Sequence, residues 1–332
     1  MYEFNKISKD DLITIFRNTA RKMNVQETIV EKDYWVCFVL NYLFSTCIWK
    51  ESFTFKGGTS LSKCFSLIHR FSEDIDLILD WRVIGYAKDE PWELRSKTQQ
   101  DKFNKESNQK VTVFLEEQFI GQMMIDFNNF LDDEFCIRID DKDPQAVLFE
   151  YPKVFRSEYL LQAVRLEIGA LAAWTPSETA TVLPYVAEQY PQVFQGSKIE
   201  IKTVSPERTF WEKATILHHE ANRPDSLDIP KRYARHYYDL YCIGNSKYKD
   251  YIFSNIDQLV KVVSFKEKFY SRKWANYESA TKEKIRLLPD KYRFKELKED
   301  YENMKEMFFD EYPNFEDLMA GIAKLEDEIH DI

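Results

Sequence analysis

The sequence predicts an α+β fold in which a mixed β-sheet is flanked by helices and followed by an α-helical C-terminal half. Helical periodicity dominates up to about residue 44, short alternating runs recur between residues 52 and 204, and helical patterns fill the rest. We therefore expect N-terminal helices plus an α/β domain over 1–204, and a helical domain over 205–332.

The N-terminal elements follow from this periodicity. Helices are expected at about 8–23 and 26–44, then a short strand in "SFTFKG" and a helical stretch in "TSLSKCFSLI". The run "DIDLIL", residues 74–79, alternates as a strand does. The polar segment 85–108 predicts a loop or insertion, and 109–130 predicts a long helix.

The second half of the sheet is expected in four further runs. These are residues 135–139, 146–151, 160–168 and 198–204, with an acidic turn over 140–145. Ser205 followed by Pro206 is typical of the start of a helix. From there onward we expect helices almost throughout.

Composition excludes several classes of protein. Apolar residues make up 44% of the 332 residues, which is enough for a sizeable core. No apolar run reaches the ~18 residues of a membrane span, and the N-terminus lacks a signal pattern, so we expect a cytoplasmic protein without a membrane partner. The five cysteines form no CxxC pair or Cys/His cluster, which argues against a structural zinc site or a disulfide framework.

The net charge of −10 is unevenly distributed. Residues 296–332 carry 13 acidic and 3 basic residues, whereas 246–295 carry 13 basic and 6 acidic residues interleaved with aromatics. The basic segment suits phosphate contact and base stacking, or else consists of helices with solvated lysines and buried aromatics. The acidic tail could dock on that segment or on a basic partner, but we favour an amphipathic helix packed on the C-terminal half.

Two adjacent glycines stand out in a chain with only 8. Gly57 and Gly58 lie between a predicted strand and a predicted helix, and the hydroxyls of Thr59 and Ser60 follow. Such a turn lets backbone approach a ligand and offers N–H groups to phosphate. The spacing matches neither a P-loop nor a dinucleotide-binding fingerprint.

Two aspartates on the next strand complete the pattern. Asp74 and Asp76 share one face, about 6.5 Å apart, and can share a hard cation or flank a magnesium pair for phosphoryl transfer. The alternative is an exposed edge strand beside an ordinary turn, and we favour the functional interpretation. Glu167 on a later strand is a candidate third ligand, with a simple Arg165–Glu167 surface pair as the equal alternative.

These residues resemble a known family. "FKGGTSLSKCF…HRFSEDIDL" is similar to nucleotidyltransferase toxins of the AbiEii/AbiGii type, which have the DNA polymerase β-like nucleotidyltransferase fold. The stretches "VEKDYWVCFVL", "SPERTFWEKATILHHEANR" and "RHYYDLYCI" resemble the same family, so the likeness covers roughly residues 25–245.

The resemblance implies roles for individual residues. It implies that Asp74 and Asp76 bind Mg²⁺ or Mn²⁺, that Lys213 meets the nucleotide phosphates, and that Asp239 completes the cleft as a base, a metal helper or the partner of Lys213. The residues that would hold the triphosphate are Gly57, Gly58, Thr59 and Ser60. From the sequence alone, an exposed lysine is the commoner fate of Lys213, and a helix-surface pair with Arg235 that of Asp239.

The resemblance also implies a function. We expect a magnesium-dependent toxin of a bacterial toxin–antitoxin or phage-defence system, with an antitoxin encoded nearby. It would transfer a nucleoside monophosphate from a nucleoside triphosphate to RNA, with the 3′ end of tRNA as the expected acceptor. The basic segment 246–295, which lies outside the resemblance, would supply an RNA surface with Arg272, Lys273 and Arg286 as contacts. The alternatives are a protein or small-molecule hydroxyl as acceptor, or a non-catalytic nucleotide-binding module.

Overall fold

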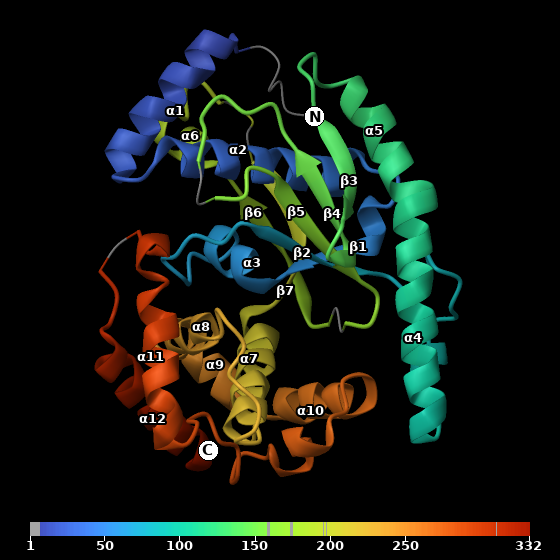
Figure 1. The fold of residues 1–332 in the computed structure, drawn as a ribbon, viewed down its shortest axis with the longest axis vertical. Coiled ribbons are helices and arrows are strands. Elements are labelled where there is room, and N and C mark those ends of the chain that lie inside the picture. The colour runs from blue at the N-terminus through green and yellow to red at the C-terminus, as the bar shows by residue number, and fades with distance from the viewer. Residues whose placement is uncertain (1–6, 158–159, 173–174, 195, 197, 310) are drawn as a thin grey trace. The chain divides into compact units, whose positions relative to one another are not determined.

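The computed structural model describes residues 7–157, 160–172, 175–194, 196, 198–309 and 311–332 (Figure 1). Contacts divide the chain into two compact units. The α/β unit comprises Met1–Cys64 and Phe71–Val204, and the helical unit comprises Phe65–Arg70 and Ser205–Ile332. The short segment 65–70 therefore packs with a unit that otherwise begins more than a hundred residues later. The predicted α+β class is confirmed.

The α/β unit is built on one seven-stranded mixed sheet with the order β3-β4-β5-β2-β1-β7-β6. Strand β2 pairs in parallel with β5 and antiparallel with β1, and β1 pairs in parallel with β7. Strand β2 is thus central and is not the edge strand of our alternative interpretation. The strands are β1 Phe53–Lys56, β2 Asp74–Leu79, β3 Cys136–Asp140, β4 Asp143–Glu150, β5 Val164–Gly169, β6 Ser177–Val182 and β7 Ile199–Val204.

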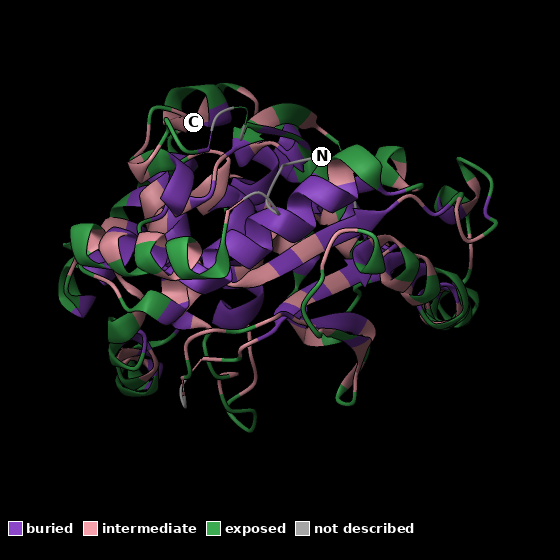
Figure 2. Ribbon diagram, turned by 90° about the horizontal axis from the view of Figure 1, so that it is seen from above, coloured by how far each residue is buried: buried purple, intermediate pink, exposed green. Residues whose placement is uncertain are grey.

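The two faces of this sheet differ. Ile75, Leu77 and Leu79 of β2 are at most 1% exposed, whereas Asp74 and Asp76 on the other face are partly exposed. Figure 2 shows this alternation as buried and intermediate bands along the strands. One face is therefore core, and the other carries the polar candidates for function.

Helices α2 (Glu27–Asn41) and α5 (Ile120–Asn128) cover the apolar face. Phe38 of α2 lies 5.1 Å from Phe127 of α5 and 6.3 Å from Phe149 of β4, measured between ring centroids. Phe127 and Phe149 in turn meet edge to face at 5.0 Å. Aromatic pairs of this kind add stability beyond the area they bury. Contacts of this kind contribute to the burial of α2 on nearly all sides.

Helix α4 (Lys97–Phe114) corrects the prediction of a loop over 85–108. Ser96 and Gln99 form a capping box that starts the helix twelve residues before the expected position, at 109. Phe103 and Val111 are buried and anchor it, and the helix continues through a π-helical turn, Leu115–Phe119, into α5. Its polar composition hid the helical pattern.

Other boundaries differ for local reasons. Helix α3 (Gly57–Lys63) ends at Lys63 rather than near residue 68, since Phe65–Arg70 belong to the helical unit. Strand β6 and helix α6 (Tyr185–Gln189) were not predicted, because β6 is a polar edge strand without an apolar face of its own. Helix α1 (Lys9–Met23) begins as expected, with the Ser8 side chain accepting from the Asp11 N–H.

The helical unit contains α7 Pro206–Ala221, α8 Ala234–Gly244, α9 Lys249–Ser254, α10 Asp257–Phe269, α11 Phe294–Glu302 and α12 Phe315–His330. The expectation of helix almost throughout is wrong between residues 270 and 293, where short 3₁₀ turns and the left-handed Asn276 (φ 50°) replace it. None of the described helices combines the length and apolar character needed to cross a bilayer.

The acidic tail folds as the packed amphipathic helix that we favoured. Helix α12 buries Leu318, Ile322, Leu325 and Ile329. A Cβ on Gly321 would lie 2.4 Å from the Tyr241 ring of α8, so only glycine allows the two helices to approach this closely. The acidic residues occupy the remaining face of α12.

Candidate functional site

Asp74 and Asp76 lie side by side on the polar face of the central strand. In the parallel register of β2 and β5, Asp74 is opposite Arg165 and Asp76 is opposite Glu167. Directly paired residues of neighbouring strands point to the same face. The four charged side chains therefore form a compact group, with Lys56 of β1 opposite Asp76 on the other side.

The electrostatics of this group favour a bound cation. Burial raises the pKa of Asp74, and the nearby negative charges of Glu73 and Asp76 raise it further, whereas Lys32 and Arg165 only partly compensate. Crowded carboxylates of this kind are costly to ionise together. A divalent cation would remove that cost, so the donor set fits a hard metal ion such as Mg²⁺.

The glycine turn lies directly against one of these carboxylates. Gly57 has φ +85°, and a Cβ added there would lie 1.9 Å from Oδ2 of Asp76. Glycine is therefore required at position 57 for two reasons: the positive φ of the backbone and the close approach of the Asp76 carboxylate. The structure brings together two motifs that are separated by some sixteen residues in the sequence.

The side-chain hydroxyls of Thr59 and Ser60, beside the turn, form hydrogen bonds to backbone carbonyls of the protein. Thr59 Oγ1 donates to the Asp74 carbonyl at 2.6 Å, and Ser60 Oγ donates to the Gly57 carbonyl at 3.0 Å. Both side chains are buried. The Thr59 bond ties α3 to the start of β2, and the Ser60 bond stays within α3. A nucleotide contact at Gly57, Gly58, Thr59 and Ser60 would therefore come from the main chain.

Glu167 is engaged by its neighbour. Arg165 forms ion pairs with Glu167, with Asp140 at 3.1 Å and with Asp143 at 2.8 Å. The arrangement matches the Arg165–Glu167 pair of our alternative interpretation, and the role of Glu167 as a metal ligand stays a prediction. Within the described residues, no three His, Cys, Asp or Glu side chains are grouped so that they could hold a metal.

The helical unit contains a second charged cluster. Lys213 of α7 lies 2.7 Å from Oδ2 of Asp239 of α8, and the guanidinium of Arg70 donates to both oxygens of Asp239 at 2.8 Å. Asp239 is fully buried, while the side chains of Arg70 and Lys213 are 3% and 8% exposed. An exposed lysine and a surface aspartate, the alternatives from sequence, are therefore both wrong.

Burial alone would raise the pKa of Asp239. The cations of Arg70 and Lys213 overcome that effect and hold the pKa well below its usual range. The two cations thus favour the ionised carboxylate, which is paired with both of them. Arg70 was not predicted, although it lies in the quoted "HRFSEDIDL".

Sequence reasoning also missed three consecutive charges in α2. Glu31, Lys32 and Asp33 are buried, at 0%, 0% and 4% exposure, within an otherwise apolar helix. Charged residues are almost never fully buried unless paired, so such a triplet in an apolar run is a usable signal. Each of the three binds a different segment.

Lys32 donates to Glu73, the residue before Asp74, and to the Leu161 carbonyl at 2.6 Å. Asp33 pairs with Lys63 at the end of α3 at 2.7 Å and accepts from the Tyr185 N–H. Helix α2 is therefore tied to the strand and to the helix that carry the candidate site. Both contacts are polar and directional, so they fix positions as well as stabilise the fold.

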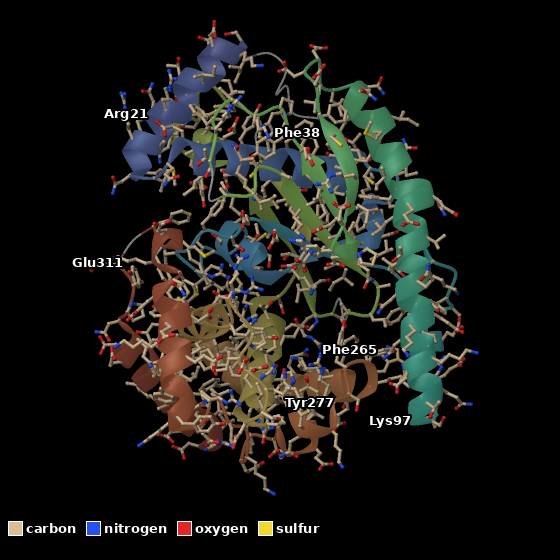
Figure 3. All side chains as sticks on the ribbon, in the orientation of Figure 1. Arg21, Phe38, Lys97, Phe265, Tyr277 and Glu311 are labelled. Atoms are coloured by element: carbon tan, nitrogen blue, oxygen red, sulfur yellow. The ribbon has the colours of Figure 1, made fainter. Side chains whose placement is uncertain are left out.

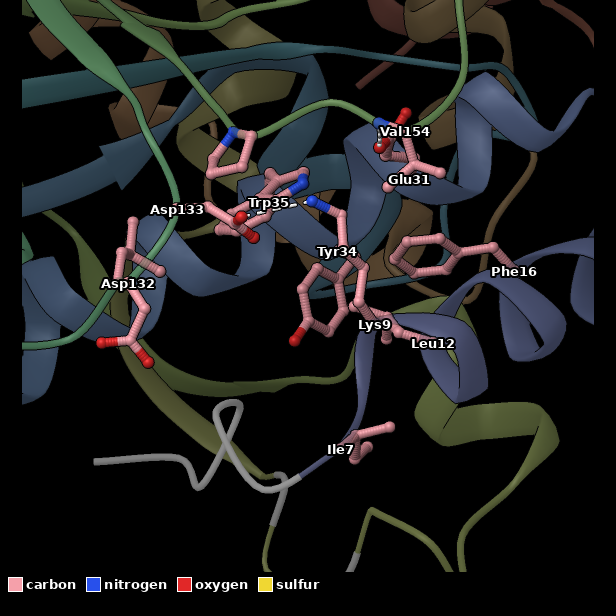
Figure 4. A pocket seen from close by; sticks show the side chains of 12 residues that line it. Ile7, Lys9, Leu12, Phe16, Glu31, Tyr34, Trp35, Asp132, Asp133 and Val154 are labelled. Carbon is pink, nitrogen blue, oxygen red and sulfur yellow. Dashed lines mark hydrogen bonds and ion pairs between the residues drawn. The ribbon is translucent and has the colours of Figure 1, made fainter.

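Glu31 accepts from the backbone N–H groups of Val154 and Phe155 at 2.6 and 3.2 Å, and burial raises its pKa to about 6. It lines a pocket of about 160 Å³ together with Tyr34 and Trp35 (Figure 4). None of the predicted site residues lines this pocket. It is separate from the carboxylates on β2.

The predicted RNA contacts Arg272, Lys273 and Arg286 are exposed. The aromatics of the same segment divide into two groups. Phe265 and Tyr277, labelled in Figure 3, are 5% and 7% exposed and belong to the core. Three others remain more than half exposed: Tyr251 at 58%, Tyr270 at 52% and Tyr292 at 57%.

Comparisons with known proteins found one matching family and a similar solved structure. The family model described as "Nucleotidyl transferase AbiEii toxin, Type IV TA system" matches residues 39–321. Among solved structures, MenT4, a nucleotidyltransferase toxin from Mycobacterium tuberculosis H37Rv, matches with 14% identity and a TM-score of 0.45, over 95% of this chain and 97% of that one. No curated protein matches.

Proposed function

The chain belongs to the AbiEii family of nucleotidyltransferase toxins of type IV toxin–antitoxin systems, as the match over residues 39–321 shows, and from this premise we propose a specific reaction. The protein transfers a nucleoside monophosphate from a nucleoside triphosphate to RNA, with the 3′ end of tRNA as the expected acceptor. The family implies an antitoxin, which we expect to be encoded nearby. The proposed substrates are cytoplasmic, so we expect the protein to act there.

One observation carries the proposal. Asp74 and Asp76 stand on the central strand of the sheet, and the Gly57 turn approaches Asp76 so closely that no side chain fits between them. Two carboxylates beside a glycine turn support the proposal, because nucleotidyl transfer requires carboxylates for a metal ion close to backbone N–H groups for phosphate.

Asp74 and Asp76 would hold Mg²⁺ or Mn²⁺, with Glu167 as the third candidate ligand. The raised pKa of Asp74 and the absence of any side chain on Gly57 are the features that fit such an ion. When bound, the ion would neutralise charge on the phosphates. Arg165 would then have to release Glu167 while keeping Asp140 and Asp143.

The reaction breaks one bond and forms another. The acceptor hydroxyl loses its proton to solvent as its oxygen forms a bond to the α-phosphorus. The bond from that phosphorus to the bridging oxygen breaks, and pyrophosphate leaves. Lys213 meets the nucleotide phosphates and offsets their negative charge. Three roles were open for Asp239, and its commitment to Arg70 and Lys213 favours the role of Lys213 partner over that of a base.

Exposed cations support an RNA acceptor. Arg272 and Lys273 follow the exposed Tyr270, and such a combination suits a phosphate contact beside a stacked base. Arg286 is partly engaged by Asp290 at 3.1 Å. RNA binding should therefore weaken steeply with salt, as expected when counterions are released.

A labelling experiment tests the acceptor. Purified protein and Mg²⁺ would be mixed with each of four α-labelled nucleoside triphosphates and a cell extract, which is then separated into RNA, protein and small molecules. We expect label in a tRNA-sized band, and none from Asp74→Asn/Asp76→Asn. Label only in protein or in small molecules would overturn the RNA acceptor, and nucleotide binding without label in any fraction would indicate a non-catalytic module.

A further inference from the structure

Gly169 ends strand β5 on the same face as the candidate metal site. Strand β5 alternates cleanly, with Leu166 and Ile168 buried and Arg165, Glu167 and Gly169 partly exposed. In the register with β2, Gly169 is opposite Ile78, two residues beyond the Asp76–Glu167 pair. It therefore continues the row formed by Arg165 and Glu167.

Within the described part of the chain, neither backbone conformation nor side-chain contact requires glycine at this position. Gly169 is not among the described glycines with positive φ, which are Gly57, Gly85 and Gly196. A Cβ built on it meets no heavy atom of the described residues within 4 Å. At Gly244, by contrast, a Cβ would lie 2.8 Å from the Leu325 side chain.

A glycine within a sheet has a cost. It loses more conformational freedom on folding than any other residue and contributes no side chain to packing. Glycine in a strand often marks a bulge, a bend, or a place where a ligand or another backbone approaches closely. Among the described residues neither conformation nor packing accounts for Gly169, and its position on the face of the candidate metal site favours the approach of a ligand.

We infer that a nucleotide unit of the substrate lies against the backbone of Gly169, and that this residue determines how the substrate is seated beside Asp76 and Glu167. The inference rests on the proposed function. A ribose or a base is broad and can lie against the backbone only where no side chain projects. Gly169 leaves that space open, and any larger residue would occupy it. The unit is either the sugar and base of the nucleoside triphosphate or the terminal nucleotide of the RNA acceptor.

Substitution separates this role from a structural one. Gly169→Ala and Gly169→Val add methyl groups to open space, so both variants should fold and unfold at the same temperature as the wild type or slightly above it. Gly121 of α5 gives the matched control, because its Cβ also meets no described atom and it is exposed. Gly121→Ala should leave transfer unchanged.

The KM values for the two substrates identify the unit. For Gly169→Val we expect one KM to rise by about 10-fold or more, because methyl groups added where the substrate binds change substrate discrimination on this scale. A rise for the nucleoside triphosphate assigns Gly169 to the donor, and a rise for RNA alone assigns it to the acceptor. A folded Gly169→Val protein with wild-type KM values for both substrates would overturn the inference.

The inference can fail separately from the proposed function. If the wild type and Gly121→Ala transfer no label to any acceptor, the proposed transfer is wrong. Equilibrium binding of each nucleoside triphosphate with Mg²⁺, and of total RNA, is then compared for the wild type and Gly169→Val. Weaker binding of either ligand by Gly169→Val supports the seating role, and equal affinities overturn it.

Discussion

The ammonium group of Lys213 lies 2.7 Å from the carboxylate of Asp239, and both side chains are buried. The Arg70 guanidinium binds both oxygens of the same carboxylate, so one negative charge is shared by two positive charges. Removing one partner of a buried ion pair leaves the other charge without compensation, which is strongly destabilising. The three residues should therefore respond differently to substitution.

Asp239→Asn removes the carboxylate charge that Arg70 and Lys213 share, and we expect it to lower the free energy of unfolding by about 3–5 kcal/mol. Lys213→Met should be milder, because the Arg70–Asp239 pair remains, and should remove transfer activity from a folded protein. Denaturant unfolding followed by the transfer assay measures both effects. An Asp239→Asn protein as stable as the wild type would contradict the buried network.

Gly57→Ala should damage the site more than the fold. Positive φ alone costs roughly 1–2 kcal/mol for a non-glycine residue. The added Cβ would also displace the Asp76 carboxylate, and we expect transfer to fall by about 10²-fold. Gly85→Ala is the matched control, since it has φ +88° but open space around its Cβ. Equal activities of the two variants would contradict the close approach to Asp76.

Lys32 and Glu73 should be energetically coupled. Lys32→Met removes the cation from a fully buried site, and we expect a loss of stability of about 3 kcal/mol. In a double-mutant cycle with Glu73→Gln, the coupling should be about 1–3 kcal/mol. Lys9→Met in the exposed Lys9–Asp133 pair should cost less than about 1 kcal/mol. Strict additivity of the Lys32 and Glu73 variants would disprove the contact.

Glu167 and Glu150 are a natural comparison, because the side chain of each is 43% exposed and each pairs with an arginine. If Glu167 is a metal ligand, Glu167→Gln should raise the Mg²⁺ concentration for half-maximal transfer by about 10-fold or more. Glu150→Gln should leave it unchanged. If transfer by the two variants depends on Mg²⁺ concentration in the same way, Glu167 is not a metal ligand and serves only as the ion-pair partner of Arg165.

Acid should destabilise the helical unit through His219. Burial, with the nearby positive charges of Lys266, Arg272 and Arg223, lowers the pKa of His219 to about 3. The unfolded chain then binds the proton more tightly, so stability falls as the pH drops below about 6.5, by roughly 1–2 kcal/mol between pH 7 and pH 5.

Substitution of His219 isolates this effect. His219→Phe keeps the stacking on Trp274 at 4.2 Å and should flatten the pH dependence, although the lowered pKa values of His218 and His236 retain part of it. Thermal unfolding at pH 5, 6 and 7 measures this, with the exposed His330→Gln as control. Parallel curves for His219→Phe and the wild type would contradict the assignment.

The local signals of the candidate site were readable from the sequence. Alternation placed Asp74 and Asp76 on one face of a strand, and the rarity of glycine drew attention to Gly57. The family match confirms the resemblance drawn from these residues. Strand order and register were not readable, so the positions of Arg165 and Glu167 opposite the two aspartates required the structure.

Ion pairs between residues far apart in the sequence could not be predicted either. Arg70 meets Asp239 across 169 positions, and Lys32 meets Glu73 across 41, and no periodicity links such partners. The start of helix α4 was not predicted, because most of its residues are polar and show no clear apolar periodicity. The only local signal for its first residue is the capping box of Ser96 and Gln99. Edge strand β6 was not predicted, because its sequence lacks the alternation of apolar and polar residues that marks a strand with one buried face.

The most direct test of nucleotidyl transfer compares two positions of the label. The wild type and Asp74→Asn would be supplied with Mg²⁺, RNA and either α-labelled or γ-labelled nucleoside triphosphate. The account predicts that the α-label enters RNA, that the γ-label appears only in released pyrophosphate, and that folded Asp74→Asn does neither. Entry of the γ-label into the acceptor, or full activity of Asp74→Asn, would contradict it.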